Sequence, residues 1–216
     1  MKIIIIPGVG YQTDVDKHNY LGEEIKKKIN TDYEVFNWNH DSVPANLTNQ
    51  FTDVKKRMDK QLPDEKALAY NSLRRYIAEA ILDFQYAIKY GSTIEIPEAD
   101  YYIGHSAGSL FAIAQNKPAT IMGSPYALVK YGPKDFMDDN GFLAQISLNT
   151  NPILNLINEY DVLAHPIYEG MFLNKFFRGS WLNPFTYFPL TAHTSYWESK
   201  FVIKSISDHF SMTLNV

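Results

Sequence analysis

The 216-residue sequence contains no cysteine. This absence excludes a disulfide framework, thiolate metal ligands and a cysteine nucleophile. It also fits a reducing compartment, so we expect a cytoplasmic protein. Lysine and arginine number 20 against 24 aspartates and glutamates, which gives a net charge of −4. Because the chain has no excess of positive charge, a nucleic-acid partner is not expected.

Long apolar runs are also missing. None approaches the ~20 residues that a membrane-spanning helix needs, so we expect no membrane span. The isoleucine run at residues 3–6 is too short for a signal-peptide core, and Pro7-Gly8 interrupts it. Hydrophobic residues make up 45% of the chain and charged residues 20%, which is ordinary for a folded soluble protein. The length favours one domain over residues 1–216.

Apolar runs and amphipathic stretches alternate along the chain. Because strands that alternate with helices build a mostly parallel sheet flanked by helices, we predict an α/β fold. The predicted strands cover residues 2–6, 33–38, 97–103, 119–122 and 153–157, the predicted helices cover 14–29, 46–60, 64–89, 110–115 and 196–210, and loops are expected at 130–141 and 170–190.

Residues 101–110 combine a short apolar strand, a G-x-S-x-G turn and the start of a helix. This pattern is typical of a nucleophilic serine, whose strained backbone lifts the hydroxyl clear of the sheet. Gly104 and Gly108 are expected where strand and helix backbones pass too closely for a Cβ. We therefore predict Ser106 as the nucleophile.

Three further positions follow predicted strands in the same way: Val9, Ser124 and Asp161. Active sites of parallel sheets lie beyond the carboxyl ends of the strands. We expect these residues and Ser106 to gather at one edge of the sheet.

A serine nucleophile needs a base, and six histidines are available. His193 lies in a predicted loop directly ahead of the last helix, from which its imidazole can reach the sheet edge. His209 falls inside that helix, and His105 lies in the serine turn with its ring expected to point away from the hydroxyl. We predict His193 as the base.

The base needs an orienting acid, and Asp161 directly follows a predicted strand. Capping of a turn is the alternative role for this residue. The rival carboxylates Asp135, Asp138 and Asp139 cluster in a polar loop. We predict Asp161 as the acid.

An oxyanion hole needs two backbone donors. The N–H of Ala107, the residue after the nucleophile, is one candidate, and Val9 in the first loop is the other. Residues 7–10 can also be read as a plain turn. A phosphate-binding loop is a further alternative, although the third glycine and the Lys-Ser/Thr pair of nucleotide motifs are missing. The mechanism needs no cofactor or metal.

The ordered motifs PGVG, GHSAG, NEYD and HTSYW resemble the α/β-hydrolase superfamily, in which the triad follows the order serine, acid, histidine. The segments GHSAGS, MGSP and DVLAHP are similar to the lipase and esterase branches. Two features depart from the family: its His-Gly oxyanion loop is Pro7-Gly8 here, and we expect the strand at residues 2–6 to carry this loop without the family's first hairpin ahead of it. The resemblance implies a trimmed version of the fold.

Together these features predict a serine hydrolase that cleaves a small acyl ester through an acyl-enzyme. A thioester, an amide or a peptide would suit the same machinery, and a non-catalytic binding module on this scaffold is the alternative from another class. Seven aromatic residues between the acid and the base could line a substrate pocket, pack the core or mark a lid: Phe172, Phe176, Phe177, Trp181, Phe185, Tyr187 and Phe188. The acyl chain length and the oligomeric state stay open.

Overall fold

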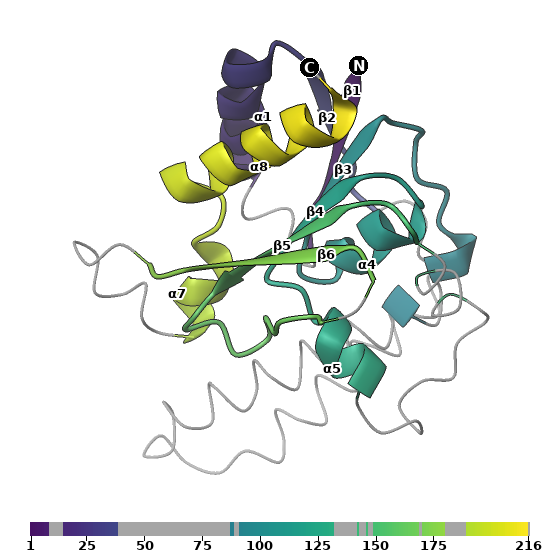
Figure 1. Cartoon of the computed structure of the whole chain (residues 1–216), viewed down its shortest axis with the longest axis vertical. Coiled ribbons are helices and arrows are strands. Elements are labelled where there is room, and N and C mark those ends of the chain that lie inside the picture. The colour runs from purple at the N-terminus through teal and green to yellow at the C-terminus, as the bar shows by residue number, and fades with distance from the viewer. Residues whose placement is uncertain are drawn as a thin grey trace.

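The computed structural model of the chain describes residues 1–8, 15–38, 87–88, 91–131, 142, 146, 149–168, 170–179 and 189–215. Among these residues, six strands form one sheet in which every neighbouring pair is parallel (Figure 1). The strand order is β2-β1-β3-β4-β5-β6. The strands are β1 (Lys2–Ile6), β2 (Asp32–Val35), β3 (Tyr101–His105), β4 (Ala119–Met122), β5 (Ile153–Asn158) and β6 (Phe172–Phe177). The α/β class predicted from the sequence is confirmed.

Helices cover both faces of this sheet. The described helical segments are α1 (Val15–Ile29), η3 (Gly91–Thr93), α4 (Gly108–Ala114), α5 (Tyr126–Tyr131), α7 (Pro189–Thr194) and α8 (Lys200–Leu214). Helices α1 and α8 pack against each other, as Figure 1 shows, and share one core with the sheet face that they cover. Helix α4 packs with the opposite face.

The isoleucine run of β1 explains why the sheet is buried on both faces. Residues 3–6 are all 0% exposed. Successive side chains of a strand point to opposite faces. Accordingly, Ile3 and Ile5 join the core under α1 and α8, whereas Ile4 and Ile6 join the core under α4. Full burial of each such side chain stabilises the fold by about 1.5–3 kcal/mol.

The strand order reverses between β1 and β3. From β1 the chain passes through α1 to β2 on one side, and it later enters β3 on the other side of β1. Ligands of open parallel sheets bind beyond the carboxyl ends of the strands at such a reversal. The reversal therefore favours a ligand site at the residues that follow β1 and β3.

Most strand predictions hold, with shifted ends. The strands at residues 2–6 and 119–122 are confirmed as predicted, and the strand predicted at 153–157 continues to Asn158. β2 ends at Val35 rather than at Trp38, whose indole Nε1–H instead donates to Pro7 O at 2.7 Å. β3 begins at Tyr101 rather than at Pro97, whose carbonyl accepts from the Tyr102 hydroxyl at 2.9 Å.

Four local predictions are wrong. β6 lies in the segment that was expected to be irregular. α5 includes Lys130, where a loop was expected, and His193 lies in α7 rather than in a loop. The last helix begins at Lys200, not at Tyr196, because the Ser199 side chain caps it by accepting from the Val202 N–H at 3.4 Å.

Some predictions fall outside the described residues. The predicted helix at 46–60 does so entirely, and of the helix at 64–89 only residues 87 and 88 are described, both helical. Residues 132–141, with the rival carboxylates Asp135, Asp138 and Asp139, also lie outside, as does His40. Among the described residues, no helix has both the length and the apolar character that crossing a membrane requires.

Candidate active site

Ser106 follows β3 directly and has a left-handed backbone with φ of +52°. The other described non-glycine residues with positive φ are all asparagine, which tolerates this region better than serine does. Two backbone hydrogen bonds hold the turn: Ser106 N–H donates to Met122 O at 3.0 Å, and Ser106 O accepts from Ser109 N–H at 3.0 Å. A strained serine at this position has the geometry of a nucleophile elbow.

Three glycines allow the backbones around Ser106 to approach one another. A Cβ on Gly104 would lie 2.5 Å from the Cα of Ser109, so the close passage of strand and helix predicted there is confirmed. A Cβ on Gly108 would lie 2.1 Å from Ile6 O, at the end of the neighbouring strand β1. A Cβ on Gly8 would lie 2.6 Å from the Cβ of Ser106 and 3.2 Å from its Oγ. The loop after β1 and the serine turn are therefore in contact at the strand-order reversal.

His193 and Asp161 form a buried pair. Nδ1 of His193 lies 2.9 Å from Oδ2 of Asp161, and the exposed fractions of the two side chains are 7% and 0%. Because a carboxylate accepts hydrogen bonds, the hydrogen of a neutral His193 ring lies on Nδ1. Nε2 then carries a lone pair that can accept a proton, as a general base must.

The Asp161 carboxylate is held in place by donors from three sides. Its Oδ1 accepts from Leu163 N–H at 3.0 Å, and its Oδ2 accepts from the Tyr196 hydroxyl at 2.9 Å as well as from His193. Burial alone raises the pKa of Asp161, but the charge and hydrogen bond of His193, with these other donors, bring this pKa below its ordinary value. Asp161 is therefore an anion at neutral pH.

Gly123 links the serine turn to this pair. It follows Met122, the residue whose carbonyl accepts from Ser106 N–H. A Cβ on Gly123 would lie 2.9 Å from Oδ2 of Asp161 and 3.0 Å from Cε1 of His193. Gly123 also has a φ of +57°. The ends of β3, β4 and β5 thus bring the serine turn, Gly123 and the His193–Asp161 pair to one edge of the sheet.

Of the two predicted oxyanion donors, one is described. Ala107 is 0% exposed and directly precedes α4. The first N–H groups of a helix lack acceptors within it, and the Ala107 N–H adjoins Ser106. Val9 lies outside the described residues. Its neighbour Gly8 is described and contacts Ser106.

Ser124, the remaining residue expected at this edge, is buried in a hydrogen-bonded chain. The Tyr126 N–H donates to Ser124 Oγ at 3.2 Å, and the two oxygens Ser124 Oγ and Ser109 Oγ lie 2.7 Å apart. Ser109 Oγ–H donates to Ser106 O at 2.5 Å. Ser124 therefore supports the serine turn from β4.

Two residues that were not predicted for the site contact the pair. Tyr196 was expected to begin the last helix, but it is buried in a turn with its hydroxyl on Asp161. His105, whose ring was expected to point away from the serine hydroxyl, contacts the rings of His193, Tyr196 and Trp197. Its Nε2 also donates to the His193 carbonyl at 2.6 Å. Burial, followed by the charge of His193, lowers the pKa of His105 to about 3, so it stays neutral.

Other candidates lie elsewhere. His209 is buried in α8, with its Nδ1 2.5 Å from the hydroxyl of Tyr101 at the opposite end of β3. His165 is exposed.

Phe177 packs edge-to-face on Tyr196 and belongs to the core, whereas Phe176 is exposed. The aromatic residues from Trp181 to Phe188 lie outside the described part of the chain.

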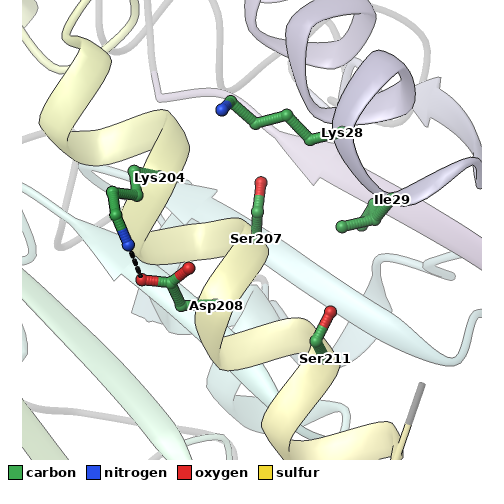
Figure 2. Close-up of a pocket in the computed structure, with 6 residues that line it drawn as sticks. All are labelled: Lys28, Ile29, Lys204, Ser207, Asp208 and Ser211. Atoms are coloured by element: carbon green, nitrogen blue, oxygen red, sulfur yellow. Dashed lines mark hydrogen bonds and ion pairs between the residues drawn. The ribbon is translucent and has the colours of Figure 1, made fainter.

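A separate hollow of about 340 Å³ lies between α1 and α8 (Figure 2). It is lined by Lys28, Ile29, Lys204, Ser207, Asp208 and Ser211. Lys204 is paired with Asp208 at 2.6 Å, and Ser207 Oγ–H donates to Ile203 O. Because the end of α1 leads to the start of β2, this hollow lies toward the amino ends of the strands, away from Ser106.

Among the described residues, no three histidine, aspartate or glutamate side chains come together in a way that could hold a metal ion. Comparison of the chain with protein-family models, with curated protein sequences and with solved structures gave no match.

Proposed function

We propose that this chain is a serine hydrolase that cleaves a carboxylic ester through an acyl-enzyme, on a trimmed α/β-hydrolase fold. The observation that carries the proposal is the buried His193–Asp161 pair, which adjoins Gly123 next to the left-handed Ser106. A buried carboxylate, an oriented imidazole and a strained serine at one sheet edge are the parts that serine hydrolysis requires.

Each residue has a defined part in the first half of the reaction. Ser106 Oγ attacks the carbonyl carbon of the ester while Nε2 of His193 takes its proton. Asp161 holds the Nδ1–H of His193 and stabilises the imidazolium that forms. The backbone N–H groups of Ala107 and Val9 donate to the oxyanion of the tetrahedral intermediate. Collapse of this intermediate breaks the ester bond, and His193 delivers the proton to the leaving alcohol.

The second half repeats these roles with water as the nucleophile. His193 removes a proton from water, the hydroxide attacks the acyl carbon, and the same N–H groups bind the second oxyanion. Collapse releases the carboxylic acid and returns the proton to Ser106. Every proton moves among Ser106, His193, the substrate and the attacking water, so the cycle uses no cofactor.

Replacement of Ser106 by alanine tests the proposal. We expect Ser106→Ala to lower the turnover of a nitrophenyl ester by several orders of magnitude and to abolish labelling by a fluorophosphonate probe. Ser207→Ala is a matched control, because Ser207 is similarly buried (7% exposed against 6%) but lies on α8. It should keep wild-type turnover and labelling.

Wild-type turnover in the Ser106→Ala protein would refute the mechanism. A wild-type protein that neither turns over esters nor reacts with the probe would instead favour the binding module. If the wild type is active, its rates on matched esters, thioesters and amides would define which acyl bond it prefers.

A further inference from the structure

Tyr196 has a hydroxyl whose hydrogen-bond partners fix its direction. Asn158 N–H lies 2.9 Å from this hydroxyl and can only donate to it. The hydroxyl hydrogen therefore points to the other partner, Oδ2 of Asp161, also at 2.9 Å. Burial raises the pKa of Tyr196 well above its ordinary value, and Asp161 raises it further. Tyr196 thus stays a neutral donor at neutral and acidic pH.

This hydroxyl and His193 share one carboxylate oxygen. Oδ2 of Asp161 accepts from the Tyr196 hydroxyl and from Nδ1 of His193, both at 2.9 Å. The positive end of the O–H dipole consequently points at the same oxygen that accepts the Nδ1–H of His193. Such a dipole withdraws negative charge from the oxygen that stabilises imidazolium, and it opposes protonation of the ring.

The carboxylate has little freedom to turn away from either donor. Its Oδ1 accepts from Leu163 N–H, two residues along the chain. Tyr196 itself is 0% exposed, and its ring packs edge-to-face on Phe177 and contacts His105. Loss of the hydroxyl should therefore change the charge on Oδ2 without releasing Asp161 from His193.

We propose that Tyr196 is a positioning residue of the proposed hydrolase: its hydroxyl shares Oδ2 of Asp161 with His193 and thereby keeps the base unprotonated to a lower pH. The inference rests on the proposed function for its catalytic meaning. The coupling between the three side chains can be measured without any turnover.

Few other titratable groups among the described residues face His193. Asp161 faces it from the loop after β5, and the ring of His105 faces it from β3 at a centroid distance of 4.8 Å. His18 on α1 lies behind them, against Trp197 at 4.2 Å. Because the pKa of His105 is about 3, its ring is neutral across the range in which an ordinary imidazole titrates.

NMR titration of His193 tests the proposal directly. The ring signals of ¹³C- or ¹⁵N-labelled histidine are followed with pH in the wild type and in Tyr196→Phe, and a His193→Asn protein assigns the resonance. We expect the midpoint of the His193 titration to rise by about 0.5–1 pH unit in Tyr196→Phe, because the full carboxylate charge then acts on the ring. If the protein hydrolyses esters, the acid limb of kcat/KM should shift by the same amount.

Tyr102→Phe is the matched control. Tyr102 is also buried (2% exposed), and its hydroxyl also accepts from a backbone N–H, that of Ala99 at 2.9 Å. It donates to Pro97 O instead of a carboxylate. Both variants leave a buried backbone donor without its acceptor, but only Tyr196→Phe removes a donor from Asp161 and should move the His193 midpoint.

An unchanged or lower midpoint in folded Tyr196→Phe would overturn the proposal, as would an equal rise in Tyr102→Phe. Failure of the proposed function has a different signature. In that case neither protein turns over esters or reacts with a fluorophosphonate, while the difference between the two NMR titrations still decides the role of Tyr196.

Discussion

Ser106 and Gly123 both have left-handed backbones, and they follow neighbouring strands of the sheet. For a serine, this conformation costs of the order of 1–3 kcal/mol and persists only where the surroundings enforce it. The hydrogen bond from Ser106 N–H to Met122 O and the contact with Gly8 enforce it here. Gly123 has the same backbone conformation without this cost, and it leaves room for the His193–Asp161 pair.

Gly123→Ala should therefore damage the site. A Cβ at this position would lie 2.9 Å from Asp161 Oδ2 and 3.0 Å from two ring atoms of His193, so the pair must move. Displacement of about 1 Å in an active site can cost 10²-fold in rate. If the chain hydrolyses esters as proposed, kcat/KM for a nitrophenyl ester should fall by about 100-fold.

Gly170→Ala separates this contact from the strain of the backbone. Gly170 has a φ of +60°, close to that of Gly123, but the nearest atom to its added Cβ would be a Phe172 carbon at 3.8 Å. In urea unfolding, Gly170→Ala should lose the stability that backbone strain costs, and Gly123→Ala should lose at least as much. Equal losses of activity in the two variants would show that strain, not contact with the pair, is responsible.

The residue types of the site were predictable to different degrees. Ser106 could be predicted from a local pattern, because the strained turn needs glycines two residues before and two residues after the serine. His193 and Asp161 could be chosen from their places after predicted elements, and the structure brings those two side chains into contact. Tyr196 and His105 carry no local signal for their contacts, since a buried tyrosine or histidine at these positions also fits plain core packing.

At the scale of elements, a one-way chain of hydrogen bonds ties α5 to the serine turn. Ser109 Oγ–H donates to Ser106 O, so Ser109 Oγ must accept from the Ser124 hydroxyl. Ser124 Oγ in turn accepts from the backbone N–H of Tyr126. The chain therefore connects the turn after β3, the first turn of α4 and the start of α5.

Mutation of Ser109 and Ser124 should be non-additive. Ser109→Ala leaves the buried Ser124 hydroxyl without an acceptor, and Ser124→Ala leaves Tyr126 N–H and the Ser109 oxygen without partners. Each should cost about 1–3 kcal/mol in the free energy of unfolding. The double variant removes both hydroxyls at once and should cost less than the sum, as urea unfolding would measure. Additive costs would contradict the chain.

The elements that sequence reasoning missed owe their form to tertiary contacts. β6 has exposed Leu173 and Phe176 beside half-buried Phe172, so it lacks a clean alternation, and it forms because it pairs with β5 along its whole length. The apolar spacing of Tyr196 and Trp197 fits a helix equally well, but their burial arises from a turn that places Tyr196 on Asp161. By contrast, β1 and β4 are buried on both faces, and their apolar runs were sufficient to predict both strands from the sequence.

At the scale of the whole molecule, the sheet face that α1 and α8 cover buries His105 and His209, which stay neutral. Burial, followed by the charge of Lys175, lowers the pKa of His209 to about 4, and burial lowers that of His105 to about 3. An unfolded histidine titrates near pH 6.5. Between these values the unfolded chain binds more protons than the native protein, so the free energy of unfolding falls as the pH drops below about 6.5.

The size of this effect can be assigned to one residue. Between pH 6 and 5, His209 should contribute a slope of about 1 kcal/mol per pH unit to the free energy of unfolding, since one proton is worth at most about 1.4 kcal/mol per unit. His209→Asn keeps a polar side chain beside the Tyr101 hydroxyl, which lies 2.5 Å from Nδ1 in the wild type, but asparagine cannot be protonated in this range. Urea unfolding of this variant at a series of pH values should show a slope lower by about that amount.

His165→Asn is the control for this measurement, because it makes the same substitution at an exposed position. Its stability should follow the wild-type dependence on pH. Asp161 affects the stability in a different pH range. Because its pKa is lowered in the folded protein, its contribution to the free energy of unfolding is lost only as the pH falls below the ordinary pKa of an aspartate. If His209→Asn kept the full wild-type slope of the unfolding free energy between pH 6 and 5, the acid sensitivity would have to arise from His105 and other groups. Burial of His209 on α8 would then not limit the pH range in which the sheet stays folded.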